Sequence, residues 1–144
     1  MTAAPGTVGL QEGHLLLMRQ TYFLIATAIG EGGTGLSLLV LPSVPLALLL
    51  GLDQASTELL VIARIAGAAL LALGVACWPR RNDDNSHAQE GLLLGILLYD
   101  LAAAGILAYS GWFVGLAGIA LWPAVGLHVA LAVSCGAIIS GRIR

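Results

Sequence analysis

The sequence predicts an all-α membrane protein, a polytopic bundle of four transmembrane helices with a short outer interfacial helix between the first two. Two features of the composition indicate this class: 58% of the 144 residues are hydrophobic and only 10% are charged. This profile lies outside the range of soluble globular domains. Four long apolar stretches provide the helices, because a bilayer core of roughly 30 Å needs about 20 apolar residues per helix.

The four stretches give the expected spans in chain order, at about residues 15–41, 57–78, 91–109 and 117–140. The first is interrupted only by Arg19, Gln20 and Glu31, and its length, with three more spans behind it, argues against a cleaved signal peptide. The second ends before Pro79, where a helix is expected to stop. Pro123 predicts a kink in the fourth span unless the helix begins there.

The segments outside the spans complete a single domain, expected over residues 14–141. The apolar run 46–52 is too short to cross and predicts a helix lying along the outer interface. Asp53 or Ser56 is expected to start the next helix. Residues 1–13 predict a mobile cytoplasmic N-terminus, and residues 142–144 a cytoplasmic tail.

The distribution of arginine predicts the orientation. The chain has no lysine, and all but one of its arginines fall on one side of a four-span arrangement, at positions 19, 80, 81, 142 and 144. The two connections on the other side carry no basic residue. The positive-inside rule therefore places both termini in the cytoplasm.

A glycine pattern in the first span has two interpretations. Gly30, Gly32 and Gly35 match the G-x-G-x-x-G of a dinucleotide-binding turn. That turn joins a strand to a helix N-terminus, whereas these glycines lie inside a membrane span. We expect them to allow close approach of neighbouring helices instead, as do the pairs Gly67 and Gly74, and Gly91 and Gly95.

Each span carries one ionisable residue near its centre: Glu31, Arg64, Asp100 and His128. An isolated charge at this depth costs about 2.5–3.5 kcal/mol, so the four are expected to point inward and meet. In the simplest arrangement, Arg64 pairs with Glu31 or Asp100, and His128 donates to the remaining carboxylate.

Polar neighbours support this buried centre. Gln20, Thr27 and Thr34 recur with Glu31 at helical spacing, and Tyr99 precedes Asp100. The network could serve only to specify helix packing. It could also bind a small polar ligand or a proton, since histidine titrates near neutral pH.

Other function classes are disfavoured. No G-x-S-x-G or H-E-x-x-H motif predicts an enzyme, and no basic field predicts nucleic-acid binding. Haem would need a second ligand besides His128 within the membrane, and neither His14 nor His87 lies there. The two cysteines form no C-x-x-C pair, so no metal and no cofactor is expected.

The segments "GEGGTGLSLLVLPS" in the first span and "ARIAGAALLALGVACW" in the second resemble the small four-helix bacterial membrane proteins called DoxX-like. The resemblance implies a multi-pass bundle in the bacterial plasma (inner) membrane, without an established activity, and carries over no catalytic residue.

We therefore expect a non-enzymatic integral membrane protein built around a buried polar centre that binds a small polar ligand or a proton. The alternative is a structural or accessory subunit, either of a homo-oligomer or of a larger membrane complex, with the charges serving only helix packing. A ligand site requires a cavity beside the four charges, whereas a subunit requires an external face lined by glycine and alanine.

Overall fold

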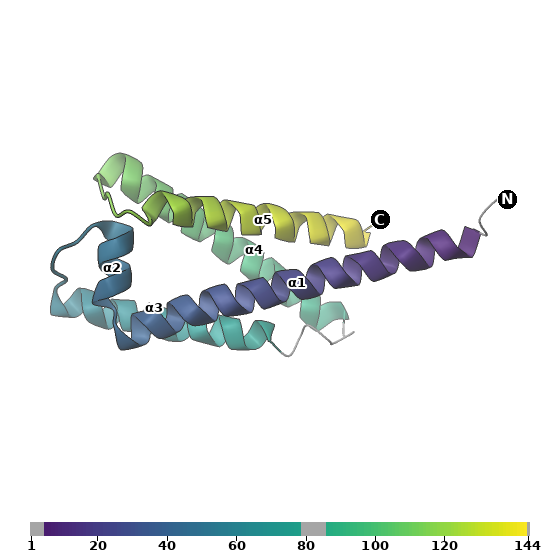
Figure 1. Ribbon diagram of the computed structural model, residues 1–144, viewed down its shortest axis with the longest axis horizontal. Helices are drawn as coiled ribbons and strands as arrows, with labels where there is room; N and C mark the ends of the chain where they lie inside the picture. Colours follow the sequence, from purple (N-terminus) through teal and green to yellow (C-terminus); the bar gives the residue numbers. More distant parts are fainter. Residues whose placement is uncertain (1–4, 79–85, 144) are drawn as a thin grey trace.

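The structure is a computed structural model that describes residues 5–78 and 86–143, and every regular element within them is helical. The elements are α1 (Pro5–Val40), α2 (Ser43–Leu50), α3 (Thr57–Cys77), α4 (Ser86–Tyr109), the π-helical turn η2 (Ser110–Val114) and α5 (Leu121–Ile143). The four long helices run roughly side by side, and α2 lies across one end of them (Figure 1). We call this end the α2 end; α1 begins and α5 finishes at the opposite end, the terminal end.

Four helical segments among the described residues are long and apolar enough to cross a membrane: Leu17–Val40, Thr57–Cys77, His87–Val114 and Leu121–Gly141. The predicted all-α bundle with four candidate spans is confirmed. α1 begins at Pro5, so much of the segment expected to be a mobile N-terminus continues the first helix. Arg80, Arg81 and Arg144, on which the predicted orientation partly depends, lie outside the described residues.

The helix ends follow from local chemistry. The Ser56 side chain accepts a hydrogen bond from the Leu59 backbone nitrogen at 3.3 Å and caps α3. α2 ends at Leu50 and is capped by Gly51, whose φ of 72° is in the left-handed region that glycine adopts without strain. α5 begins at Leu121, not at 117 as predicted, so Pro123 falls in the first turn, where its missing N–H costs no helical hydrogen bond.

α1 and α3 pack against each other along glycines. A Cβ added at Gly35 would lie 2.5 Å from the Leu71 backbone nitrogen and 2.6 Å from the Gly67 carbonyl oxygen. A Cβ at Gly74 would lie 2.8 Å from the Gly32 backbone nitrogen. The two backbones are therefore in direct contact, which confirms the close approach predicted for Gly67 and Gly74.

The other predictions made for glycines have different outcomes. Gly30, Gly32 and Gly35 all lie inside α1, so their spacing does not form a dinucleotide-binding turn. The close packing predicted at Gly30, Gly91 and Gly95 is wrong, because a Cβ at any of them would meet nothing within 4 Å. Gly91 and Gly95 lie on an exposed face of α4 that no other described element reaches.

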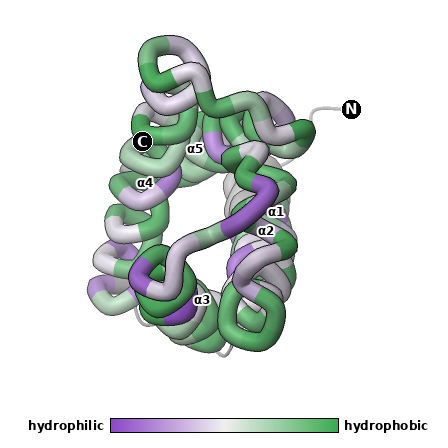
Figure 2. The backbone as a smooth tube through the Cα atoms, turned by 90° about the vertical axis from the view of Figure 1, so that its left-hand side faces the viewer, coloured by the Kyte–Doolittle hydropathy of each residue, from purple (hydrophilic) through white to green (hydrophobic). Residues whose placement is uncertain are grey.

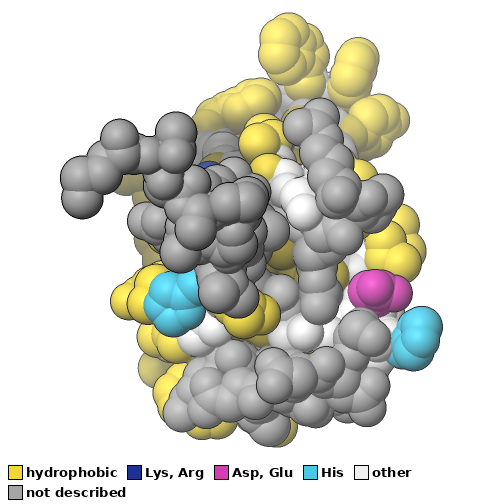
Figure 3. Space-filling view, turned by 90° about the vertical axis from the view of Figure 1, so that its right-hand side faces the viewer, with side chains coloured by type: hydrophobic (Ala, Val, Ile, Leu, Met, Phe, Trp, Pro, Cys, Tyr) yellow, Lys and Arg dark blue, Asp and Glu magenta, His cyan; other side chains and the backbone are white. Residues whose placement is uncertain are grey.

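The terminal half of the bundle is closed by an apolar core to which all four long helices contribute. Its buried members are Phe23, Leu24, Ala28, Cys77, Leu93, Ile96, Cys135 and Ile138. The Cys135 thiol donates to the Leu93 carbonyl at 3.2 Å and joins α5 to α4. The exposed side chains of His87 and Glu90 lie 3.9 Å apart near the start of α4. Figure 3 shows histidine, acidic and hydrophobic side chains on the surface of the terminal end.

At the α2 end the long helices form two pairs, α1 with α3 and α4 with α5, on opposite sides of the centre (Figure 2). A small apolar cluster of Leu38, Leu46 and Ala63 holds α2 on the first pair. The Ala120 amide, in the segment before α5, donates to the Leu48 carbonyl at 2.8 Å. α2 therefore bridges the two pairs.

Candidate functional site

A cavity of about 790 Å³ lies between the two helix pairs, in the half of the bundle that α2 covers. α2 contributes Val44, Pro45, Leu48 and Leu49 to its wall, and most of the remaining lining residues are apolar. The polar lining side chains come from α1, α4 and α5: Thr27, Glu31, Thr34, Ser37, Tyr99 and His128. Its volume is typical of small-molecule sites.

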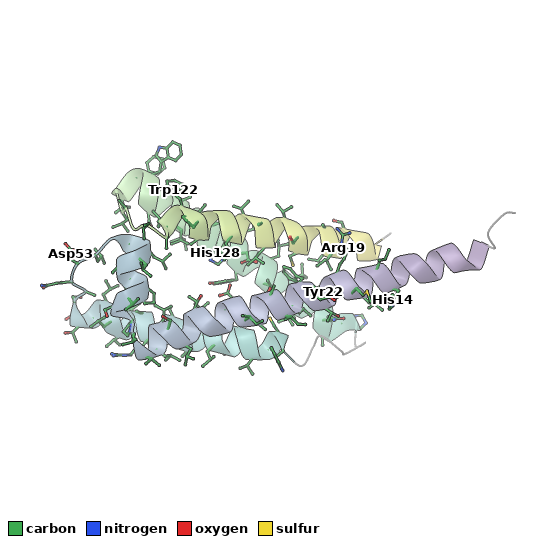
Figure 4. The ribbon with its side chains drawn as sticks, in the orientation of Figure 1. His14, Arg19, Tyr22, Asp53, Trp122 and His128 are labelled. Carbon is green, nitrogen blue, oxygen red and sulfur yellow. The ribbon has the colours of Figure 1, made fainter. Side chains whose placement is uncertain are left out.

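The strongest polar contact beside the cavity joins Asp100 of α4 to His128 of α5. The His128 Nδ1 atom lies 2.8 Å from the Asp100 Oδ1 atom, the length of a charge-assisted hydrogen bond. The Asp100 side chain is only 1% exposed and that of His128 13%. Figure 4 shows His128 on the side of α5 that faces α1. The predicted contact between His128 and a carboxylate is therefore present, with Asp100 as its partner.

Glu31 reaches the same place from α1. One ligand atom each from Glu31, Asp100 and His128 lies within 4.8 Å of the other two, so the three side chains form one centre. The Tyr99 hydroxyl is within hydrogen-bonding range of the Glu31 carboxylate. The Tyr99 ring meets the His128 ring edge-to-face, with the centroids 5.5 Å apart. Tyr99 thus connects the two sides of the centre.

Two polar atoms next to this centre have no hydrogen-bond partner among the described residues: the Thr27 hydroxyl and the Asp100 Oδ2 atom. Thr27 is 2% exposed and lines the cavity one helical turn before Glu31. Leaving a buried polar group unpaired is unfavourable, so the Thr27 hydroxyl, which lines the cavity, favours a binding partner at this position. Thr34, the other predicted supporting residue of α1, also lines the cavity.

Arg64 does not belong to the centre, and its predicted pairing with Glu31 or Asp100 is wrong. The Arg64 side chain is exposed, and its Nε atom donates to the Leu39 carbonyl at 3.3 Å. This carbonyl lies in the last turn of α1, where carbonyls have no helical partner and a cation is favoured. Ala63, Gly67 and Gly74 of α3 are buried against α1, so Arg64, one position from Ala63, lies at the edge of this contact and reaches only the end of α1.

The apolar wall of the cavity is the part that sequence reasoning missed. α2 was predicted as an interfacial helix, yet it covers the cavity. Small residues could have predicted the cavity, because they leave space beside the polar stripe of α1. They are Gly30 and Gly33 on α1, and Ala103 and Ala124 on the helices opposite. A Cβ at Gly30 or Gly33 would meet nothing within 4 Å.

The donor set determines which ligands suit the centre. Two carboxylates and one imidazole are oxygen and nitrogen ligands that could hold a cation, and they would repel an anion. His14 and His87 are exposed residues of the terminal half, so neither lies beside His128 at the cavity as a second haem ligand.

No protein-family model, no curated protein and no solved structure matches this chain. The resemblance to DoxX-like proteins therefore stays a prediction.

Proposed function

We propose that this chain is a non-enzymatic integral membrane protein that binds a small ligand in its central cavity, with the polar part of the ligand at Glu31, Asp100 and His128. The observation that carries the proposal is the cavity itself, which lies beside these side chains as a ligand site requires. A network that served packing alone would have no need of a 790 Å³ space next to it.

The proposed setting is the bacterial plasma membrane, with the terminal end in the cytoplasm. Exposed tryptophans support the membrane boundaries, since indole rings favour the interfaces. Trp78 follows α3 at the terminal end and is 52% exposed. Trp112 and Trp122 meet edge-to-face near the α2 end, with ring centroids 6.3 Å apart. Figure 4 shows Trp122 pointing away from the bundle.

Cysteine labelling in whole cells tests this orientation. Asp53, before α3, and His87, at the start of α4, are both exposed and lie at opposite ends of the bundle (Figure 4 labels Asp53). An impermeant maleimide should label Asp53→Cys in intact cells and His87→Cys only after lysis. The native Cys77 and Cys135 are buried and should give little background. Labelling of both variants in intact cells would contradict the four-span arrangement.

Blocking the cavity tests the ligand-binding function. Ala124 lines the cavity, and Ala130, on the same helix, is exposed and does not. Native mass spectrometry would score adducts of decylamine, decanol and decanoate on protein released from detergent. Ala124→Phe should lose the adducts that the parent protein carries, and Ala130→Phe should keep them. Equal adducts on both variants would contradict binding in the cavity.

A second candidate function, an accessory subunit of a larger membrane complex, is favoured by one face of α4. Gly91, Gly95 and Gly105 lie exposed there, with open space where a Cβ would project, which allows another helix to approach closely. Gly95→Leu should then reduce the apparent mass of the protein on native gels of solubilised membranes. An unchanged mass would exclude docking through this face.

A further inference from the structure

We infer that the central cavity takes a single-chain amphiphile with a cationic amine head group, and that Glu31 holds the head group. The inference rests on the proposed ligand-binding function and adds the chemical class of the ligand. It is carried by three observations: the charge count of the centre, the unpartnered hydroxyl beside Glu31, and the apolar wall beyond them.

The first observation is the balance of charge among Glu31, Asp100 and His128. The centre brings together two carboxylates, those of Glu31 and Asp100, and one imidazole, and the imidazole makes its 2.8 Å bond with Asp100. A single imidazole carries at most one positive charge, so it cannot offset both carboxylates, even though Glu31 also lies within 4.8 Å of it. Arg64, which the sequence offered as its counter-charge, donates to the end of α1 instead. The centre is thus one positive charge short, in an environment where an uncompensated charge is strongly disfavoured.

An amine head group matches the donors and acceptors beside Glu31. A primary ammonium has three N–H donors and no acceptor. The Glu31 carboxylate and the unpartnered Thr27 hydroxyl can both accept, and they lie one turn apart on the cavity face of α1. The Tyr99 ring lines the same part of the cavity, and the face of an aromatic ring attracts a cation.

The rest of the cavity wall favours a ligand whose body is apolar. Beyond Glu31 toward α2, the cavity is lined mainly by aliphatic side chains, among them Leu38, Leu48, Ile106 and Leu127. Glu31 and Leu38 are seven residues apart on α1, which corresponds to about 10 Å along the helix. A sugar or a polyamine would leave its polar groups unpaired against these side chains. An alkyl chain fits them, and a carboxylate head group would be repelled by Glu31.

The experiment compares three probes that share a ten-carbon chain and differ in the head group. Isothermal titration in matched detergent micelles would measure the binding of decylamine, decanol and decanoate to the whole protein. Decylamine should bind at least about tenfold more tightly than decanol, in line with a hydrogen-bonded charge pair, and decanoate most weakly. Protein-free micelles measure partitioning of each probe into detergent.

Single substitutions test whether Glu31 causes the preference for decylamine over decanol. Glu31→Gln should reduce decylamine binding to the level of decanol and leave decanol unchanged. Glu58→Gln removes an exposed acid of α3 outside the cavity and should change neither. Thr27→Val removes a hydroxyl without changing charge, so it should weaken decylamine several-fold and spare decanol. It also supplies the test if Glu31→Gln fails to fold.

The outcomes separate the two proposals. If decanol and decylamine bind equally and Ala124→Phe abolishes both, the cavity binds ligands but the amine inference is wrong, and a proton neutralises Glu31 instead. A preference for decylamine that survives both Glu31→Gln and Thr27→Val would also overturn it. If no probe binds to the parent protein more than to protein-free micelles, the inference and the proposed function both fail.

Discussion

The two faces of α1 use the same residue type for opposite purposes. On one face, Gly35 lies in backbone contact with α3, and a Cβ there would collide with Leu71 and Gly67. On the other face, Gly30 and Gly33 border the cavity, and a Cβ there would meet nothing within 4 Å. Glycine permits close packing in one place and leaves space for a ligand in the other, and the neighbouring backbone decides which.

The two halves of the bundle show the same contrast on a larger scale. The terminal half is filled by a core drawn from all four long helices. The α2 half has its apolar contacts within the α1–α3 pair and α2, and holds the cavity between the pairs. The terminal half therefore sets the stability of the bundle, whereas the α2 half can accommodate a ligand.

The largest predicted effect tests the two faces of α1 directly. Gly35→Ala should destabilise the protein by about 3 kcal/mol or more, because the new methyl group meets backbone atoms that cannot rotate away. Gly33→Ala is the matched control, and it should be neutral or stabilising by about 0.4–1 kcal/mol through reduced flexibility of the unfolded chain. Thermal unfolding in one detergent measures both. Equal losses would show that the two faces do not differ.

The next effect concerns the bridge over the cavity. Gly118 lies directly against the backbone of Leu48 and Leu49, so Gly118→Ala should push α2 away and cost about 2 kcal/mol. Hydrogen exchange should become faster at the Ala120 amide, which bonds to Leu48, while the terminal half stays protected. Gly126→Ala, on the open side of α5, should change neither. Unchanged exchange in Gly118→Ala would mean that this contact does not hold α2.

A smaller effect tests the polar centre beside the cavity. A double-mutant cycle of Asp100→Asn and His128→Gln should give a coupling of about 1 kcal/mol, the range of hydrogen bonds measured inside membranes. Pairing Asp100→Asn with Arg64→Met is the control and should be additive within about 0.5 kcal/mol. A coupling in the control pair that equals the coupling of the first pair would place Arg64 at Asp100 after all.

These residues also show how far the sequence predicts the site. Span number follows from apolar length, and the depth of Glu31, Asp100 and His128 follows from helix rise, so their meeting could be predicted. The direction of Arg64 could not be obtained from depth. It depends on rotation about the axis of α3, which the packing of Ala63 and Gly67 on α1 determines. The cavity wall depends on where α2 lies, and its short apolar run is equally compatible with the interface.

The smallest predicted effect is an absence of coupling between Glu31 and Arg64. It distinguishes an ion pair between these two residues from the arrangement in the structure, where they lie apart. If Glu31 paired with Arg64, as depth alone suggests, Glu31→Gln would leave an unpaired arginine, and Arg64→Met would recover part of the loss. In the structure Arg64 donates to the Leu39 carbonyl and Glu31 faces Tyr99 and the cavity, so the two substitutions act on different contacts. The loss of stability in the double variant should equal the sum of the losses in the single variants within about 0.3–0.5 kcal/mol.

The two single substitutions should also affect different parts of the protein, because Arg64→Met loosens the end of α1 and Glu31→Gln changes only the cavity. Hydrogen exchange at the last turn of α1 distinguishes them, since it should rise in Arg64→Met alone. A coupling above 1 kcal/mol would restore the pair, give Glu31 its counter-charge, and remove the reason for a cationic ligand.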